Sequence, residues 1–129
     1  MESITLLFEL TSSTQIRRPK NMKITQFSVS VNNVGVGYDH PDYFLELTDE
    51  FCDRLINVNI TSISKMTRIV LKGMVERKRG LIVHVSSESG LKPVPLLSLY
   101  SAGKVIINYF QYYIGMSLQE IPGFRKIFF

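Results

Sequence analysis

Cysteine, histidine and long apolar runs are scarce in this chain of 129 residues, which bears on disulfides, metal sites and membrane spans in turn. The single cysteine, Cys52, excludes an internal disulfide and is typical of a reducing compartment. The two histidines have no neighbouring ligand set, so we expect no metal site. No run approaches the ~20 apolar residues of a membrane span. The stretch from Ile4 to Leu10 is short, contains Glu9 and has no basic flank, so we expect neither a signal peptide nor an anchor.

Glycine is absent from the first 34 residues, since the first one is Gly35. A glycine-rich turn lets the backbone approach a pyrophosphate and presents that group to a helix N-terminus. No such turn can be drawn before Gly35, and no acidic or basic residue is placed to read an adenosine ribose about twenty residues later. We therefore expect the first half of a dinucleotide-binding domain to be lacking.

The composition, with 45% apolar and 20% charged residues, is ordinary for a soluble globular protein. The net charge of +4 comes partly from Arg17, Arg18, Lys20 and Lys23 and partly from residues 77–79. We expect residues 77–79 to form the last turn of a helix capped by Gly80, where cations complement the helix dipole. There is no aromatic interleaving and no known binding motif, so we expect no nucleic-acid partner.

Two short segments have the pattern of β-strands, and each precedes a helical pattern. Residues 27–31 alternate in polarity, and residues 81–85 form an apolar run bounded by Gly80 and a serine-rich turn. A helix is expected from Thr48, with an inward stripe made by Leu55, Ile56, Asn59, Ser62, Ile63, Met66 and Val70. The order of elements and the crossover rule predict an α/β fold with the two strands parallel and both helices on one face.

A second helix is expected to be capped by Ser98 and to run on through Ile107. Its continuation has an apolar and aromatic face, which we expect to be packed: Val105, Ile106, Tyr109, Tyr112, Tyr113 and Met116. Tyr100 and Lys104 lie four apart in this helix, so they project from one face of its first turns. A phenol has a pKa of roughly 10, but a lysine ammonium and a helix N-terminus both favour the phenolate, so Tyr100 is a candidate general acid/base. The alternative is a surface pair.

Further candidates stand at strand ends and on the first helix. Ser87 ends the second strand, thirteen residues before Tyr100, and open parallel sheets place ligands at such ends. Asn32, Asn33 and Gly35 follow the first strand, where the alternative is a plain turn. Asn59 lies on the inward stripe and needs a hydrogen-bonding partner, which local backbone groups are one way to supply. His84 lies inside the second strand and is expected to be a satisfied core residue.

These motifs, in this order and spacing, resemble the short-chain dehydrogenase/reductase family: Asn32-Asn33-Val34-Gly35, Asn57-Val58-Asn59, Ser87 and Tyr100-Ser101-Ala102-Gly103-Lys104. Within that family, residues 31–43 and 74–100 look like the very-long-chain 3-oxoacyl-CoA reductases and 17-beta-hydroxysteroid dehydrogenases. The likeness spans Val29 to Phe110. It implies a partial Rossmann-like fragment of a doubly wound parallel sheet, with a divergent segment 1–26, a central and catalytic part 27–116 and a divergent tail 117–129.

The resemblance also implies an activity, which is NADP(H)-dependent reduction of 3-oxoacyl-CoA or steroid ketones. Tyr100 would pass a proton to the substrate oxygen, Ser87 would bind that oxygen, and Lys104 would hold the nicotinamide ribose and support Tyr100. Asn59 would complete a proton relay through a water. The cofactor would be approached by Asn32, Asn33, Gly35, Tyr100 and Lys104. Location at the endoplasmic reticulum and a homo-oligomer formed through the two long helices are implied in the same way.

A competing hypothesis is a truncated, catalytically inactive family member that acts, if at all, through helix contacts with another protein. For the location, the alternative to the endoplasmic reticulum is cytoplasmic. For both hypotheses we expect Ser87, Tyr100 and Lys104 to converge, with Asn59 facing the same cavity.

Overall fold

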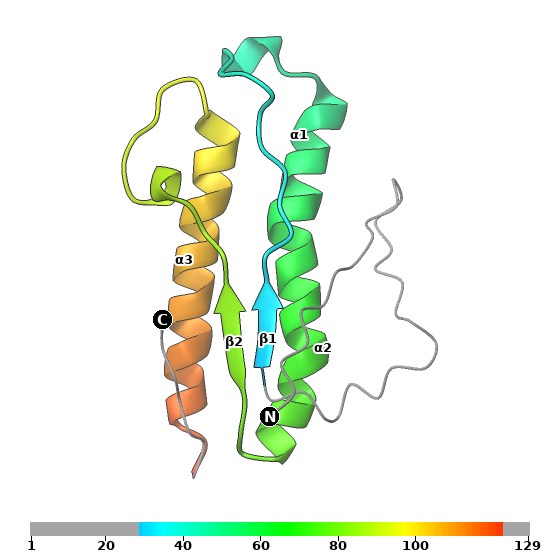
Figure 1. The fold of residues 1–129 in the computed structure, drawn as a ribbon, viewed down its shortest axis with the longest axis vertical. Helices are drawn as coiled ribbons and strands as arrows, with labels where there is room; N and C mark the ends of the chain where they lie inside the picture. The colour runs from blue at the N-terminus through cyan, green and yellow to red at the C-terminus, as the bar shows by residue number, and fades with distance from the viewer. Residues whose placement is uncertain (1–28, 123–129) are drawn as a thin grey trace.

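A computed structural model of the chain describes residues 29–122. The expectations for segment 1–26, for Phe27 and Ser28 of the first predicted strand, and for residues 123–129 of the tail lie outside this range. Figure 1 shows the elements in chain order: β1 (Val29–Asn32), η2 (Phe44–Glu46), α1 (Asp49–Ile56), η3 (Asn57–Thr61), α2 (Ser62–Glu76), β2 (Leu81–His84), η4 (Glu88–Gly90) and α3 (Ser98–Gln119).

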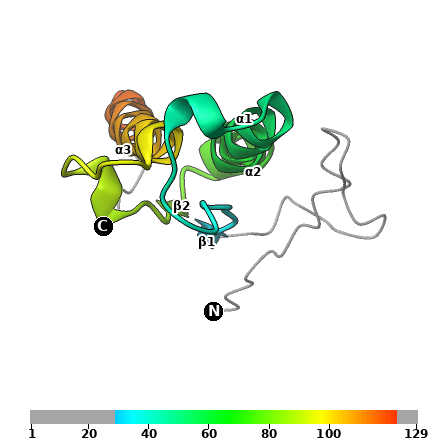
Figure 2. The same cartoon turned by 90° about the horizontal axis from the view of Figure 1, so that it is seen from above.

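The two predicted strands lie side by side and are parallel, with Val29 opposite Leu81 and Asn32 opposite His84. Their pairing is extended by one bond, in which the backbone N–H of Val85 donates to the Asn32 carbonyl at 2.9 Å. Figure 2, a view from above, shows α1, α2 and α3 on the same side of this sheet. The predicted α/β order, the parallel pairing and the single helical layer are therefore confirmed.

The first long helix begins where the sequence predicts. Thr48 is its N-cap, and the Thr48 hydroxyl accepts from the Phe51 N–H at 3.2 Å. The helix continues from α1 through a π-helical segment, η3, into α2 without leaving helical backbone angles. Most of the predicted inward stripe is buried, but Ile56 is 40% exposed because it is rotated by about 100° from its buried neighbour Leu55. The main core cluster joins α2 to β2 and consists of Met66, Val70 and Met74 with Ile82.

The C-terminus of α2 differs from the prediction. The helix ends at Glu76, and the residue in the left-handed conformation is Lys78, with φ of 54°, not Gly80. The Lys78 N–H donates to Val75 and the Arg79 N–H to Met74, both at 3.0 Å, which is a Schellman motif. Gly80 is needed for another reason, because a side chain there would overlap Met74.

Two predictions for α3 are wrong. Leu97, not Ser98, is its N-cap, and no side chain caps it. The aromatic face is not packed within residues 29–122: Tyr109, Tyr112 and Tyr113 are about 60% exposed and contact one another. Periodicity identifies an apolar face but not what covers it. Among the described helices, none is both long and apolar enough to cross a membrane.

Candidate active site

The candidate site lies at the carboxyl ends of β1 and β2, which meet at one edge because the strands are parallel. The turn after β1 and the segment after β2 both leave from this edge, and the first turns of α3 lie beside it (Figure 1). The sequence-predicted residues come from these segments and from the π-helical segment η3.

Lys104 occupies the centre of the site. Its side chain is only 5% exposed, and its Nζ donates to the Val85 carbonyl at 3.2 Å. The same nitrogen lies 5.4 Å from the centre of the Tyr100 ring. Burial lowers the pKa of the Lys104 ammonium, and within residues 29–122 no carboxylate forms an ion pair with it. Burying a cation without a counter-ion is costly, so this lysine is a candidate for function rather than for stability.

Asn59 is held in place by the turn that follows β1. It is 1% exposed, its Oδ1 accepts from the Val36 N–H at 3.0 Å, and its Nδ2 donates to the Val36 carbonyl at 2.8 Å. Val36 is 23 residues away, so the alternative of local backbone partners is wrong. The water-mediated relay from Asn59 to Lys104 stays a prediction.

Gly35 brings this turn close to both Asn59 and Lys104. A Cβ at position 35 would lie 3.1 Å from the Asn59 Oδ1 and 3.7 Å from the Lys104 Nζ. The distance to Lys104 is an ordinary contact, but the distance to Asn59 is tight, so a side chain at position 35 would push against the Asn59 amide. Asn59 itself sits in the π-helical segment, where the Ser62 N–H reaches back to the Asn57 carbonyl; such segments are frequent at functional sites.

Ser87 is fixed by the short turn that follows β2. Its backbone is extended, and its Oγ accepts from the Ser89 N–H at 3.3 Å and from the Ser89 hydroxyl at 3.1 Å. In the described part of the chain these bonds leave the proton of the Ser87 hydroxyl without an acceptor. Ser87 can therefore donate to an oxygen of a bound molecule.

The Ser87 turn is attached to α3 at the level of Lys104. The Ser86 hydroxyl donates to the Lys104 carbonyl at 3.2 Å, and the Asn108 amide donates to the Gly90 carbonyl at 3.3 Å. A Cβ at Gly90 would lie 2.8 Å from the Lys104 carbonyl carbon. The serine turn and the lysine are thus held in one register.

The remaining candidates occupy different positions. Tyr100 is half-buried and faces the same turn, since a Cβ at Gly37 would lie 3.8 Å from its Cε2. Asn33 is exposed, whereas Asn32 is buried and turns its amide inward to donate to the Thr67 hydroxyl at 3.4 Å. The structure therefore brings together Tyr100, Lys104, Asn59 and Gly35, with Ser87 attached through its neighbours, while the Asn32 side chain points away from this edge.

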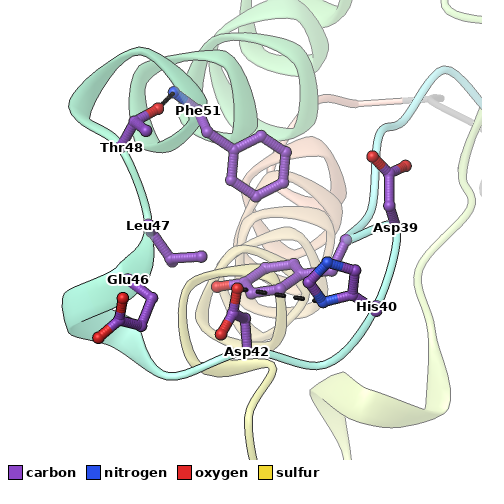
Figure 3. A pocket seen from close by; sticks show the side chains of 8 residues that line it. Asp39, His40, Asp42, Glu46, Leu47, Thr48 and Phe51 are labelled. Carbon is purple, nitrogen blue, oxygen red and sulfur yellow. Dashed lines mark hydrogen bonds and ion pairs between the residues drawn. The ribbon is translucent and has the colours of Figure 1, made fainter.

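Sequence reasoning missed the contributions made by main-chain atoms. Val36 and Val85 act through backbone groups and Gly90 through its lack of a side chain, and such roles leave no pattern in side-chain chemistry. It also missed an open pocket of about 180 Å³ beside the N-terminus of α1, which is lined by Tyr38, Asp39, His40, Asp42, Glu46, Leu47, Thr48 and Phe51. Figure 3 shows the pair of His40 and Asp42 in this pocket. His40 is mostly exposed.

Comparison with known proteins gives one consistent result. The family model described as short chain dehydrogenase matches residues 11–120. The very-long-chain 3-oxoacyl-CoA reductases of Anas platyrhynchos and Mus musculus are 49% and 51% identical over 87 residues, which is 66% of this chain. The chain spans 28% of the length of these relatives.

Solved structures agree on the fold. Serine dehydrogenase from Escherichia coli superposes with a TM-score of 0.69 at 29% identity, over 73% of this chain and 43% of that one. A 3-oxoacyl-[acyl-carrier protein] reductase from Brucella melitensis with bound NAD superposes with a TM-score of 0.67 at 31% identity, over 72% of this chain and 37% of that one.

Proposed function

The chain belongs to the short chain dehydrogenase family, and from that membership we propose that it carries the catalytic part of an NADP(H)-dependent ketone reductase. The substrate class proposed is a 3-oxoacyl-CoA, with a steroid ketone as the alternative. Support comes from relatives at about 50% identity that are named very-long-chain 3-oxoacyl-CoA reductases. We also propose that the protein works at the endoplasmic reticulum, as the resemblance implies.

The observation that carries this proposal is the buried ammonium of Lys104 beside the Tyr100 ring. The Lys104 Nζ lies 5.4 Å from the centre of this ring, and a cation beside a phenol stabilises the negative charge that develops on its oxygen as the proton leaves. Tyr100 can then donate that proton to a substrate oxygen and recover it from solvent. The Ser87 hydroxyl donates a hydrogen bond to the same oxygen and so stabilises the charge that develops on it.

The residues present fit one end of a nicotinamide dinucleotide. Of the three N–H groups on Lys104, one binds the Val85 carbonyl, and the other two are available for the ribose hydroxyls. The bare backbone at Gly35 leaves room beside this nitrogen. When bound, the cofactor supplies the hydride. Positions 1–34 of the sequence contain no glycine and therefore no glycine-rich turn for the pyrophosphate end.

A second candidate function is favoured by that same lack and by the exposed tyrosines of α3. In this alternative the chain has no turnover and acts through contacts of its helices with another protein. An exposed aromatic helix face is typical of an interaction surface.

Two experiments test the proposal. In the first, the purified chain is titrated with NADPH by calorimetry, and we expect weak or no binding and no ketone reduction, because the pyrophosphate-binding turn is lacking. Micromolar binding, with turnover abolished in Tyr100→Phe, would show that the chain is an enzyme as it stands.

In the second, residues 29–110 replace the matching segment of the mouse very-long-chain 3-oxoacyl-CoA reductase. We expect this chimera to reduce 3-oxoacyl-CoA with NADPH, and Tyr100→Phe to lower kcat by about 10² to 10⁴. The matched control is Tyr109→Phe, on the exposed face of the same helix, which should leave kcat unchanged. A chimera that binds NADPH and loses no activity in Tyr100→Phe would refute the catalytic assignment.

A further inference from the structure

Beneath the candidate site, three buried side chains and the half-buried Gln111 form a chain of hydrogen bonds that takes one residue from each of β1, α2, β2 and α3. Asn32 Nδ2 lies 3.4 Å from the Thr67 Oγ1, which lies 2.9 Å from the His84 Nε2. On the other side of the ring, the His84 Nδ1 lies 3.1 Å from the Gln111 Oε1. His84 is thus the only titratable residue among these four hydrogen-bonded side chains.

The donor and acceptor of each of these hydrogen bonds follow from one backbone group. The backbone N–H of His84 also points at the Gln111 Oε1, at 3.0 Å, and a backbone N–H can only donate. Gln111 must therefore present its oxygen, so a proton on the His84 Nδ1 donates to it. In the neutral ring Nε2 is then an acceptor, which requires the Thr67 hydroxyl to donate to it and to accept from the Asn32 amide.

In this arrangement each of these hydrogen bonds has one donor and one acceptor when His84 is neutral and carries its proton on Nδ1. With a proton on Nε2 as well, the Thr67 oxygen would have to accept from both the His84 ring and the Asn32 amide, and the Thr67 hydroxyl proton would lose Nε2 as its acceptor. Buried polar networks tolerate such a loss poorly. Protonation of His84 would therefore reverse the bond between β2 and α2, displace the Thr67 hydroxyl proton and place a charge among uncharged groups.

The hydrogen bonds of His84 lie next to the backbone groups that position Lys104. Val85, the residue after His84, donates its N–H to Asn32 and accepts from the Lys104 Nζ. Gln111 lies about two turns after Lys104 on the same helix. The side chains of Asn32, Thr67 and Gln111 therefore fix the end of β2 against α3 in the register that places the Val85 carbonyl at the lysine.

We propose that this chain of Asn32, Thr67, His84 and Gln111 is an acid-sensitive positioning device, which holds the Val85 carbonyl at Lys104 while His84 is neutral and releases it when His84 is protonated. The role of the device in catalysis rests on the proposed function, but its hydrogen bonds and its response to acid do not.

Within residues 29–122, the surroundings of His84 contain little that favours a charged ring. It is 8% exposed and meets Thr67 from α2, Gln111 and the Phe110 ring from α3, and its strand partner Asn32 from β1, none of which carries a charge. The charged group beside the end of β2 is Lys104, a cation bound to the Val85 carbonyl. Burial accordingly lowers the pKa of His84.

The sign of the pH dependence follows from that direction. An unfolded chain takes up the proton on His84 as the pH falls below about 6.5, whereas the folded chain takes it up only at lower pH. The stability contributed by neutral His84 is therefore complete above that pH and is lost as the pH falls below it. Between the pKa of His84 in the unfolded chain and its lower pKa in the folded chain, the unfolding equilibrium constant should rise by up to about tenfold for each pH unit by which the pH falls.

The test uses nuclear magnetic resonance of the isotope-labelled 129-residue chain together with urea unfolding between pH 5 and pH 8. We expect the His84 ring to show a proton on Nδ1, and the Val85 amide to lose protection from hydrogen exchange as the pH falls below about 6.5. His40→Gln is the matched control, since His40 is the other histidine of the chain and is exposed; it should leave the acid response unchanged.

Two mild substitutions change the hydrogen bonds of His84, one on each side of its ring. Thr67→Val removes the donor to Nε2 but leaves the Gln111 oxygen in place, so the ring proton should stay on Nδ1 while the Val85 amide loses protection already at neutral pH; Thr67→Ser keeps the hydroxyl and should keep that protection. Gln111→Glu offers a carboxylate to a protonated ring, so it should raise the His84 pKa and weaken the acid response. A proton on the His84 Nε2, or an acid response that persists in Gln111→Glu and vanishes in His40→Gln, would overturn the proposal. No cofactor or substrate is used, so this outcome is independent of the proposed function.

Discussion

Gly103 sits in the interior of α3, next to Lys104, and replacing it with alanine should stabilise the protein. Glycine inside a helix costs about 1 kcal/mol relative to alanine. The new methyl group would lie 3.8 Å from two side-chain carbons of Ile60 and 3.9 Å from the Asn59 Cβ, which are ordinary contact distances. Because Gly103 is buried, the methyl would add apolar burial of about 0.8 kcal/mol at most. We expect the free energy of unfolding to rise by about 1 to 2 kcal/mol.

The measurement is urea unfolding of the chain, followed by circular dichroism, together with the thermal midpoint. The expected gain corresponds to a rise in the midpoint of roughly 3–8 °C for a chain of this size. Gly90→Ala is the matched control on the other side of Lys104, because its Cβ would lie 2.8 Å from a backbone atom of α3. That variant should lose about 1–3 kcal/mol. A lower midpoint for Gly103→Ala, or no change for Gly90→Ala, would show that α3 does not pack against η3 and η4 as described.

Two further predictions concern backbone groups. Asn59→Leu leaves the N–H and carbonyl of Val36 without their partners, so we expect unfolding in urea to show a loss of about 2–4 kcal/mol; a loss below 1 kcal/mol would mean that solvent replaces both bonds. Lys78→Gly relieves the left-handed backbone at φ of 54° and should raise the free energy of unfolding by about 0.5–1 kcal/mol. Lys78→Ala keeps the backbone strain and should bring no such gain, so equal gains in both variants would assign the effect to charge.

The sequence predicts correctly those features that depend on neighbouring residues. The parallel strands follow from two short apolar or alternating runs, each before a helical pattern, and the start of the first helix follows from Thr48 and the acidic turn after it. The pairing of Tyr100 with Lys104 follows from their spacing in one helix. The expectation that His84 is a satisfied core residue is also confirmed.

Helix ends and surfaces were predicted less well. The sequence predicts that Gly80 caps α2 and Ser98 caps α3, but Lys78 takes the left-handed position after α2 and Leu97 is the N-cap of α3. Residue preferences at caps are worth only about 1 kcal/mol, and packing makes its own demands on the same positions, since a side chain at Gly80 would overlap Met74. The tyrosines of α3 follow a clear apolar period, yet the period carries no information about what lies opposite them.

By itself, therefore, the sequence determined the order and direction of the elements and the family motifs, because these depend on patterns within a few helical turns or one strand. The tertiary structure alone decided that Asn59 binds the Val36 backbone, that Val85 holds Lys104, and that Thr67 and Gln111 orient the ring of His84. Each of these contacts joins residues separated by 17 to 27 positions. Such contacts form only when the strands pair and the helices pack onto them, so no local pattern specifies them.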